Sequence, residues 1–105
     1  MVKIYCLVDP RNGLPFYVGR TTQKRLEKRL SAHVKDSKWC GVKSNKSHLI
    51  EKIIEQTGKR PLIFTLVVTS HELAPVFEEF MYWHFRNLGV EMTNNQYLFN
   101  YGKAK

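Results

Sequence analysis

The turn at residues 9–13 constrains the fold more than any other part of the sequence. Asp9-Pro10-Arg11-Asn12-Gly13 combines residues that favour a tight reversal, because proline presets one backbone angle while asparagine and glycine tolerate the left-handed region. In residues 2–9 the side chains alternate between two faces, one of which is Val2, Ile4, Cys6 and Val8, as in a half-buried strand. Residues 16–20 resemble a returning strand. The sequence therefore predicts a β-hairpin at this end of the chain.

Two tyrosines are expected on one face of this hairpin. If the hairpin is symmetric about Arg11, Tyr5 stands opposite Tyr17, and a register slipped by two residues keeps both rings on the same side.

Two helices are expected after the hairpin. The first, capped by Thr21 or Thr22, runs to about Lys35, and its core stripe is Leu26, Leu30 and Val34. The second, capped by Asn45 or Ser47, ends at Gly58, and its core face is Leu49, Ile50, Ile53 and Ile54.

A further strand and a third helix complete the pattern. Residues 62–68 are nearly all apolar, which predicts a strand well buried by helices on the sheet. The third helix starts near Thr69-x-x-Glu72, or one or two residues later, and runs to about Leu88. Its expected core face is Leu73, Phe77, Phe80, Met81, His84 and Leu88.

The 105 residues leave room for one domain, residues 1–105. The elements fit an α+β fold in which a small, mainly antiparallel three-stranded sheet is flanked by about three helices.

Positive charge is concentrated in one part of the chain. Residues 20–46 contain nine Lys or Arg against two acids, whereas residues 70–91 contain four acids against Arg86 alone, within a net charge of +8. A positive face attracts polyanions and releases their counterions on binding. The basic residues expected to guide a nucleic-acid backbone are Lys24, Arg25, Lys28, Lys35, Lys38, Lys43 and Lys46. Trp39, within this stretch, is expected either to stack on a base or to anchor its loop in the core.

The remaining composition predicts a cytoplasmic protein with no membrane contact. No signal peptide pattern follows Met1, and the longest apolar run is too short to cross a bilayer. Cys6 and Cys40 form no C-x-x-C pair, and we expect both thiols to be reduced. A zinc site made from Cys40 and His48 would have only two of the usual four ligands.

Five short motifs, in order along nearly the whole chain, resemble those of the GIY-YIG nuclease superfamily. Ile4-Tyr5 matches the end of the first motif, where Lys3 replaces the first glycine, and Tyr17-Val18-Gly19 is a variant of the second. The later motifs are Arg29-x-x-x-His33, Ala74-x-x-x-Glu78 and Leu98-Phe99-Asn100. The spacing from Tyr17 to Arg29 is longer than in some relatives, which leaves Arg25 as an alternative to Arg29.

The resemblance implies an endonuclease that hydrolyses DNA phosphodiester bonds with Mg²⁺ or Mn²⁺. It implies that Tyr5 is a general base or positions water, and that Tyr17 orients water or phosphate. Arg29 would stabilise the phosphate, and Glu78, with Glu79 as the alternative, would hold the metal. Lesser roles fall to Arg20 as a phosphate ligand, His33 as a proton relay or phosphate ligand, and Gly19 and Asn100 as structural motif residues.

Other functions remain open at this stage. The partner is expected to be duplex or branched DNA, with RNA as an alternative, and a homodimer or a recognition partner would supply selectivity. A second reading is a non-catalytic nucleic-acid-binding module on the same fold. A third is a protein-interaction domain that uses the acidic third helix as its contact surface.

Overall fold

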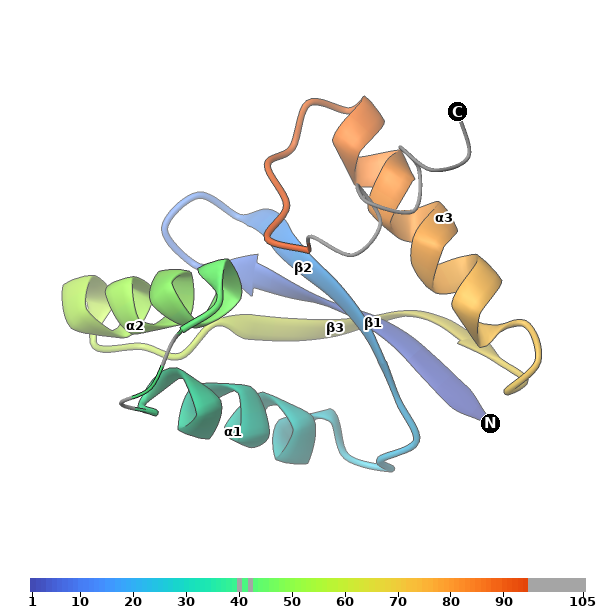
Figure 1. Cartoon of the computed structure of the whole chain (residues 1–105), viewed down its shortest axis with the longest axis horizontal. Helices are drawn as coiled ribbons and strands as arrows, with labels where there is room; N and C mark the ends of the chain where they lie inside the picture. The colour runs from blue at the N-terminus through green and yellow to red at the C-terminus, as the bar shows by residue number, and fades with distance from the viewer. Residues whose placement is uncertain (40, 42, 95–105) are drawn as a thin grey trace.

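A computed structural model describes residues 1–39, 41 and 43–94 (Figure 1). The element order is β1 (Val2–Asp9), β2 (Leu14–Thr21), α1 (Leu26–Ser37), α2 (Asn45–Thr57), β3 (Leu62–Thr69) and α3 (Ala74–Asn87). The three strands form one antiparallel sheet in the order β2-β1-β3. The predicted α+β class and the flanking helices are therefore confirmed.

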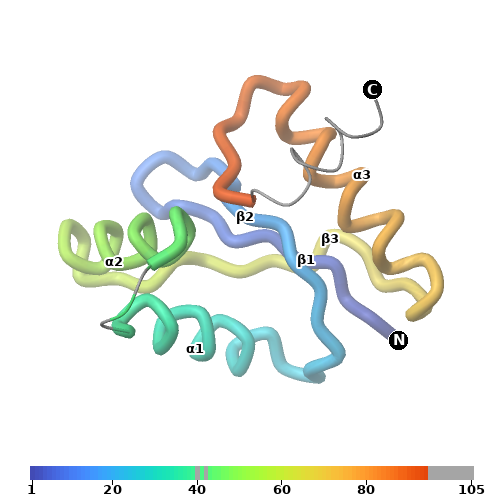
Figure 2. Tube along the Cα trace, viewed as in Figure 1, coloured from blue at the N-terminus to red at the C-terminus, as the bar shows by residue number. Residues whose placement is uncertain are grey.

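The central strand β1 separates two cores. Tyr5 and Leu7 point toward α1 and α2, where they pack with Leu30 of α1 and with Ile50 and Ile53 of α2. On the other face of the sheet, the second core consists of Val2, Ile4, Val18 and Ala74. Figures 1 and 2 show the same arrangement, with α1 and α2 together on one side of the sheet and α3 on the other. Nearly all of β1 is therefore buried.

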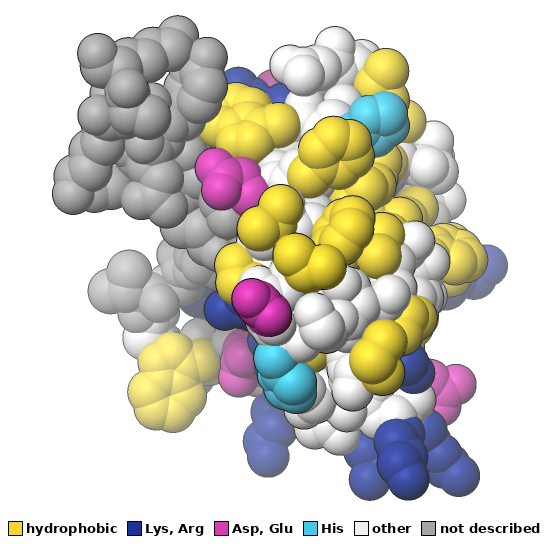
Figure 3. Space-filling model, turned by 90° about the vertical axis from the view of Figure 1, so that its right-hand side faces the viewer, with side chains coloured by type: hydrophobic (Ala, Val, Ile, Leu, Met, Phe, Trp, Pro, Cys, Tyr) yellow, Lys and Arg dark blue, Asp and Glu magenta, His cyan; other side chains and the backbone are white. Residues whose placement is uncertain are grey.

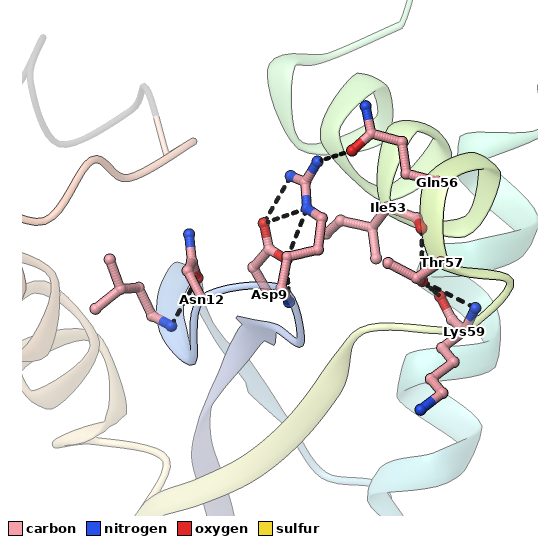
Figure 4. Close-up of polar contacts among 8 residues, drawn as sticks. Asp9, Asn12, Ile53, Gln56, Thr57 and Lys59 are labelled. Atoms are coloured by element: carbon pink, nitrogen blue, oxygen red, sulfur yellow. Dashed lines mark hydrogen bonds and ion pairs between the residues drawn. The ribbon is translucent and has the colours of Figure 1, made fainter.

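The hairpin turn is held by side chains as well as by its backbone (Figure 4). The carboxylate of Asp9 accepts hydrogen bonds from the backbone N–H of Arg11 at 2.8 Å and from its guanidinium at 2.7 Å. The same guanidinium donates to Gln56 of α2 at 2.5 Å, and Asn12 accepts from the backbone N–H of Leu14 at 2.9 Å. Arg11 thereby ties the turn to α2 and lowers the pKa of Asp9.

The hairpin register is the one slipped by two residues. Tyr5 pairs with Gly19, and Tyr17 pairs with Leu7 rather than with Tyr5. A bulge lies between Leu7 and Val8. Both tyrosine rings still face α1 and α2, as predicted.

Both helices after the hairpin start differently from the prediction. Thr21 was expected to cap α1, but it ends β2 opposite Lys3, and α1 begins only at Leu26, without a side-chain cap. The cap of α2 is Ser44, one residue before the predicted Asn45, and it accepts a hydrogen bond from the backbone N–H of Ser47. Its predicted end is confirmed: Gly58 takes φ 69° and closes the helix.

The prediction that β3 is well buried is wrong. Because β3 lies at one edge of the sheet, Leu62, Phe64 and Val68 are 45%, 51% and 51% exposed. Ile63 is the β3 residue that packs into the core beneath α1 and α2. An edge strand is hydrogen-bonded to the sheet along one side only. Its side chains are therefore covered less than those of a central strand.

The predicted inward face of α3 is also wrong in part. Leu73, Phe80, His84 and Leu88 are exposed, whereas Ala74, Glu78 and Tyr82 are buried. Of the six residues expected in the core, Phe77 and Met81 pack against it. Ala74 is buried in the second core, so α3 presents Ala74, Phe77 and Met81 to the sheet and leaves the other large apolar side chains exposed. None of the helices in the described ranges has the length and apolar character that a membrane span requires.

Candidate active site

The hydroxyl of Tyr5 is the centre of a buried polar cluster. It lies 2.6 Å from Nε2 of His33 and accepts a hydrogen bond from Nε of Arg29 at 3.1 Å. Since Arg29 can only donate, the phenol O–H is left to donate to His33, whose own proton must then be on Nδ1. That Nδ1 is buried and has no hydrogen-bond partner among the described residues.

Burial fixes the resting protonation of this pair. It raises the pKa of Tyr5 to about 12, although the hydrogen bond from Arg29 acts in the opposite direction. Burial, together with the charges of Lys46 and Arg29, lowers the pKa of His33 to about 3. At neutral pH the site therefore holds a protonated phenol and a neutral imidazole.

Tyr17 completes the ring cluster. Its centroid lies 6.4 Å from that of Tyr5 and 5.3 Å from that of His33. The ammonium of Lys46 stands 4.8 Å from the Tyr17 centroid, which is cation–π geometry. Burial lowers the pKa of Lys46, and Arg29 acts in the same direction. The structure thus brings Lys46, predicted only as a backbone guide, from α2 to the tyrosine cluster.

Gly19 leaves the space that Tyr5 occupies. A Cβ on this residue would lie 2.5 Å from the Tyr5 hydroxyl oxygen and 2.9 Å from Cε2 of Tyr17. No side chain fits there without moving the phenol. The glycine therefore makes room for the tyrosine ring, which gives this motif residue a packing role.

Glu78 reaches the site from α3. Its side chain is 12% exposed, and Oε2 lies 4.0 Å from Nε of Arg20 on β2. Its negative charge raises the pKa of Tyr5 and of Tyr17, behind the larger effect of burial. Glu79 is exposed. Of the two candidate carboxylates, Glu78 is the one directed at the cluster.

A cleft of about 580 Å³ opens beside these groups. It carries two arginines, Arg20 and Arg29, of which Arg29 also bonds Tyr5. Its other lining residues are Val2, Thr21, Thr22, Gln23, His71, Ala74 and Pro75. Arg25, the sequence alternative to Arg29, instead lines a separate hollow with Leu26 and Ile63.

The donor set fits a hard divalent cation better than zinc. Within residues 1–39, 41 and 43–94, no group of three His, Cys, Asp or Glu side chains could hold a metal ion. A lone carboxylate such as Glu78 suits Mg²⁺, which keeps several waters and takes further ligands from phosphate oxygens. Of the two residues weighed for a zinc site, Cys40 lies outside the described residues and His48 is exposed.

The predicted DNA-guiding cations lie on two neighbouring surfaces. Lys35, Lys43 and Lys46 line a hollow of about 420 Å³ with Trp39, and Lys43 forms an ion pair with Glu51. The other group lines a hollow of about 690 Å³ and consists of Lys24, Arg25 and Lys28. Lys38 is exposed at the end of α1. Trp39 is 70% exposed, so the prediction that it anchors its loop in the core is wrong.

Sequence reasoning missed Asn94. Its buried amide accepts from the backbone N–H of Val18 at 3.0 Å and donates to the Val18 carbonyl at 2.8 Å. Thr93 donates two hydrogen bonds to the Phe16 carbonyl, one from its backbone N–H at 2.7 Å and one from its hydroxyl at 2.9 Å. Residues 93 and 94 therefore pair with the outer edge of β2, next to Tyr17. The predicted motif residue Asn100 lies outside the described residues.

His71 was also missed, and nothing in its local sequence marks it as a cleft residue. Comparisons of this chain with protein-family models, with curated proteins and with solved structures gave no match.

Proposed function

We propose that the protein is a divalent-metal-dependent endonuclease that hydrolyses DNA phosphodiester bonds. The observation that carries the proposal is the hydrogen-bonded chain from Arg29 through Tyr5 to His33, beside the buried carboxylate of Glu78 and a cleft with two arginines. Buried titratable groups with strongly displaced pKa values, next to a cleft, are typical of catalytic sites. The resemblance of the sequence motifs to GIY-YIG nucleases points to the same chemistry.

Phosphate binding falls to the arginines. The guanidinium fork of Arg29 can hold two phosphate oxygens and stays charged at any working pH, and Arg20 faces the same cleft. A divalent cation held by Glu78 would add positive charge against the phosphate and the leaving 3′ oxygen. These charges oppose the negative charge that builds up in the transition state.

Proton transfer falls to Tyr5 and His33. As water attacks phosphorus, one water proton passes to the Tyr5 oxygen, and the Tyr5 proton passes to Nε2 of His33 along their 2.6 Å contact. A new P–O bond forms, and the bond to the 3′ oxygen breaks with its electron pair going to that oxygen, which takes a proton from solvent water. His33, expected from the sequence to relay a proton or bind phosphate, is then the acceptor of the water's proton.

The sharpest test compares the two site residues with matched residues outside the site. Supercoiled plasmid and branched DNA are incubated with Mg²⁺ and the wild-type chain, Glu78→Gln or Arg29→Lys. Each site variant is expected to lose at least about 100-fold in nicking rate. Two exposed residues provide controls, Glu79→Gln and Arg60→Lys, which should cleave within about twofold of wild type.

Circular dichroism confirms that each variant folds. Full nicking by either site variant contradicts the assignment of that residue. If the wild-type chain cleaves no DNA or RNA but binds both in a salt-sensitive, Mg²⁺-indifferent way, the protein is instead a non-catalytic binding module.

A further inference from the structure

One face of the molecule is apolar and exposed. We define the apolar face as two residues of β3 and three at or after the start of α3, which are between 45% and 62% exposed: Leu62, Phe64, Leu73, Val76 and Phe80. Figure 3 shows hydrophobic side chains gathered across the middle of the side that carries α3. Scattered single apolar residues are normal on a surface, but a contiguous group marks an interaction site.

The strand beneath this face has an open edge. β3 lies at the end of the sheet, and its outer backbone edge pairs with no residue in the described part of the chain. The sequence of residues 62–69 contains no charge and no proline, the usual protections against strand addition. The opposite edge, β2, is by contrast paired by Thr93 and Asn94.

We propose that β3 and the apolar face bind a second copy of this chain across a two-fold axis. Such an axis places the β3 strands of the two copies side by side and antiparallel. The two three-stranded sheets then form one sheet of six strands. Side chains of this size, about half exposed, contribute roughly 100 Å² each, which gives about 500 Å² per copy before the strand backbone is counted. A standard interface buries roughly 800 Å² per partner.

Charge favours a second copy over a nucleic acid on this face. β3 has no Lys or Arg, and the exposed charges beside its apolar side chains at the start of α3 are the acids Glu72 and Glu79. The cationic side chains of residues 24–46 lie on α1, α2 and the segments that flank them, and α1 and α2 cover the other side of the sheet. Exposed Lys59 and Arg60 precede β3, so two copies of this basic chain meet here with less repulsion than across α1 and α2, although not without any.

The cleft of the candidate active site lies next to this face, because His71, Ala74 and Pro75 line it. The Tyr5–His33 pair lies on the other side of the sheet, toward α1 and α2.

Light scattering after gel filtration tests the association from about 1 to 100 µM protein. The wild-type chain should pass from monomer to dimer, with little dependence on salt. Phe64→Glu and Phe80→Glu should each raise the dimer dissociation constant at least about 30-fold, because each buries a charge at the interface. Leu14→Glu, an equally exposed leucine at the start of β2, is the matched control and should dimerise like wild type.

Hydrogen exchange at the two ends of the concentration range locates the contact. The proposal expects slower exchange of β3 amides at high concentration and unchanged exchange in β2. A monomer throughout the range overturns it. A dimer that survives both Phe substitutions, or that protects another element, overturns it as well. Since no step requires DNA or metal, these outcomes are independent of the nuclease proposal.

Discussion

Replacing Asn94 by alanine should destabilise the fold far more than a surface substitution. The change removes two hydrogen bonds and leaves the N–H and C=O of Val18 without partners at a site where Asn94 is 2% exposed. A buried polar group that loses its partner costs about 1–3 kcal/mol, so the expected loss in unfolding free energy is about 2–5 kcal/mol. For a domain of this size that corresponds to a fall in melting temperature of at least about 10 °C.

Urea unfolding followed by circular dichroism measures the effect, with Asn87→Ala as the matched control at an exposed position. Asn94→Asp keeps the acceptor for the Val18 N–H but turns a carboxylate oxygen toward the Val18 carbonyl, and it should be at least as unstable as Asn94→Ala. If Asn94→Ala unfolds within about 0.5 kcal/mol of Asn87→Ala, the amide does not secure the β2 edge and the reasoning fails.

Three other substitutions probe the site. Gly19→Ala should cost about 1–3 kcal/mol of stability and most of the nicking activity, because its methyl displaces the Tyr5 hydroxyl; a variant with wild-type stability and rate contradicts this packing. The pKa of His33 is about 3 in the fold and about 6.5 in the unfolded chain, so below pH 6.5 the unfolded chain binds a proton that the folded chain does not. The unfolding free energy should therefore fall by about 1.4 kcal/mol per pH unit from pH 6 to pH 5. The stabilising effect of the neutral imidazole is fully present above pH 6.5. In urea unfolding, His33→Gln should reduce the dependence of the unfolding free energy on pH; an unchanged dependence would show that another group causes it. Trp39→Ala should weaken binding of single-stranded DNA about tenfold in a fluorescence anisotropy titration without lowering the melting temperature, because the ring is 70% exposed; equal affinity rules out stacking.

The hairpin and its tyrosines were predictable because their signals are local. The turn at residues 9–13 and the alternation on both sides of it determine which side chains share a face, and a slip of two residues preserves that face. Arg29 and His33 follow from helical spacing, since residues four apart lie on one side of a helix. Local periodicity therefore placed three separate segments around one cluster.

The errors concern features that depend on distant parts of the chain. The apolar run of β3 is the same whether the strand lies in the middle or at the edge of a sheet, and only the strand order decides its exposure. The rotation of α3 depends on how closely Ala74 approaches the sheet, which a helical wheel with apolar residues nearly all round does not reveal. Asn94 bonds a strand 76 residues earlier, and no local pattern marks such a partner.

The protonation states in the cluster place a condition on the proposed chemistry. Tyr5 has a pKa of about 12 and His33 a pKa of about 3, so the phenol proton stays on Tyr5 in the resting protein. Burial causes most of this gap, and the charge of Glu78 adds to it by raising the pKa of Tyr5. A cation on Glu78 would offset that charge, and water on the incoming phosphate would relieve part of the desolvation. In the proposed mechanism, the same burial that stabilises the fold would keep the base inactive until substrate and metal are both present.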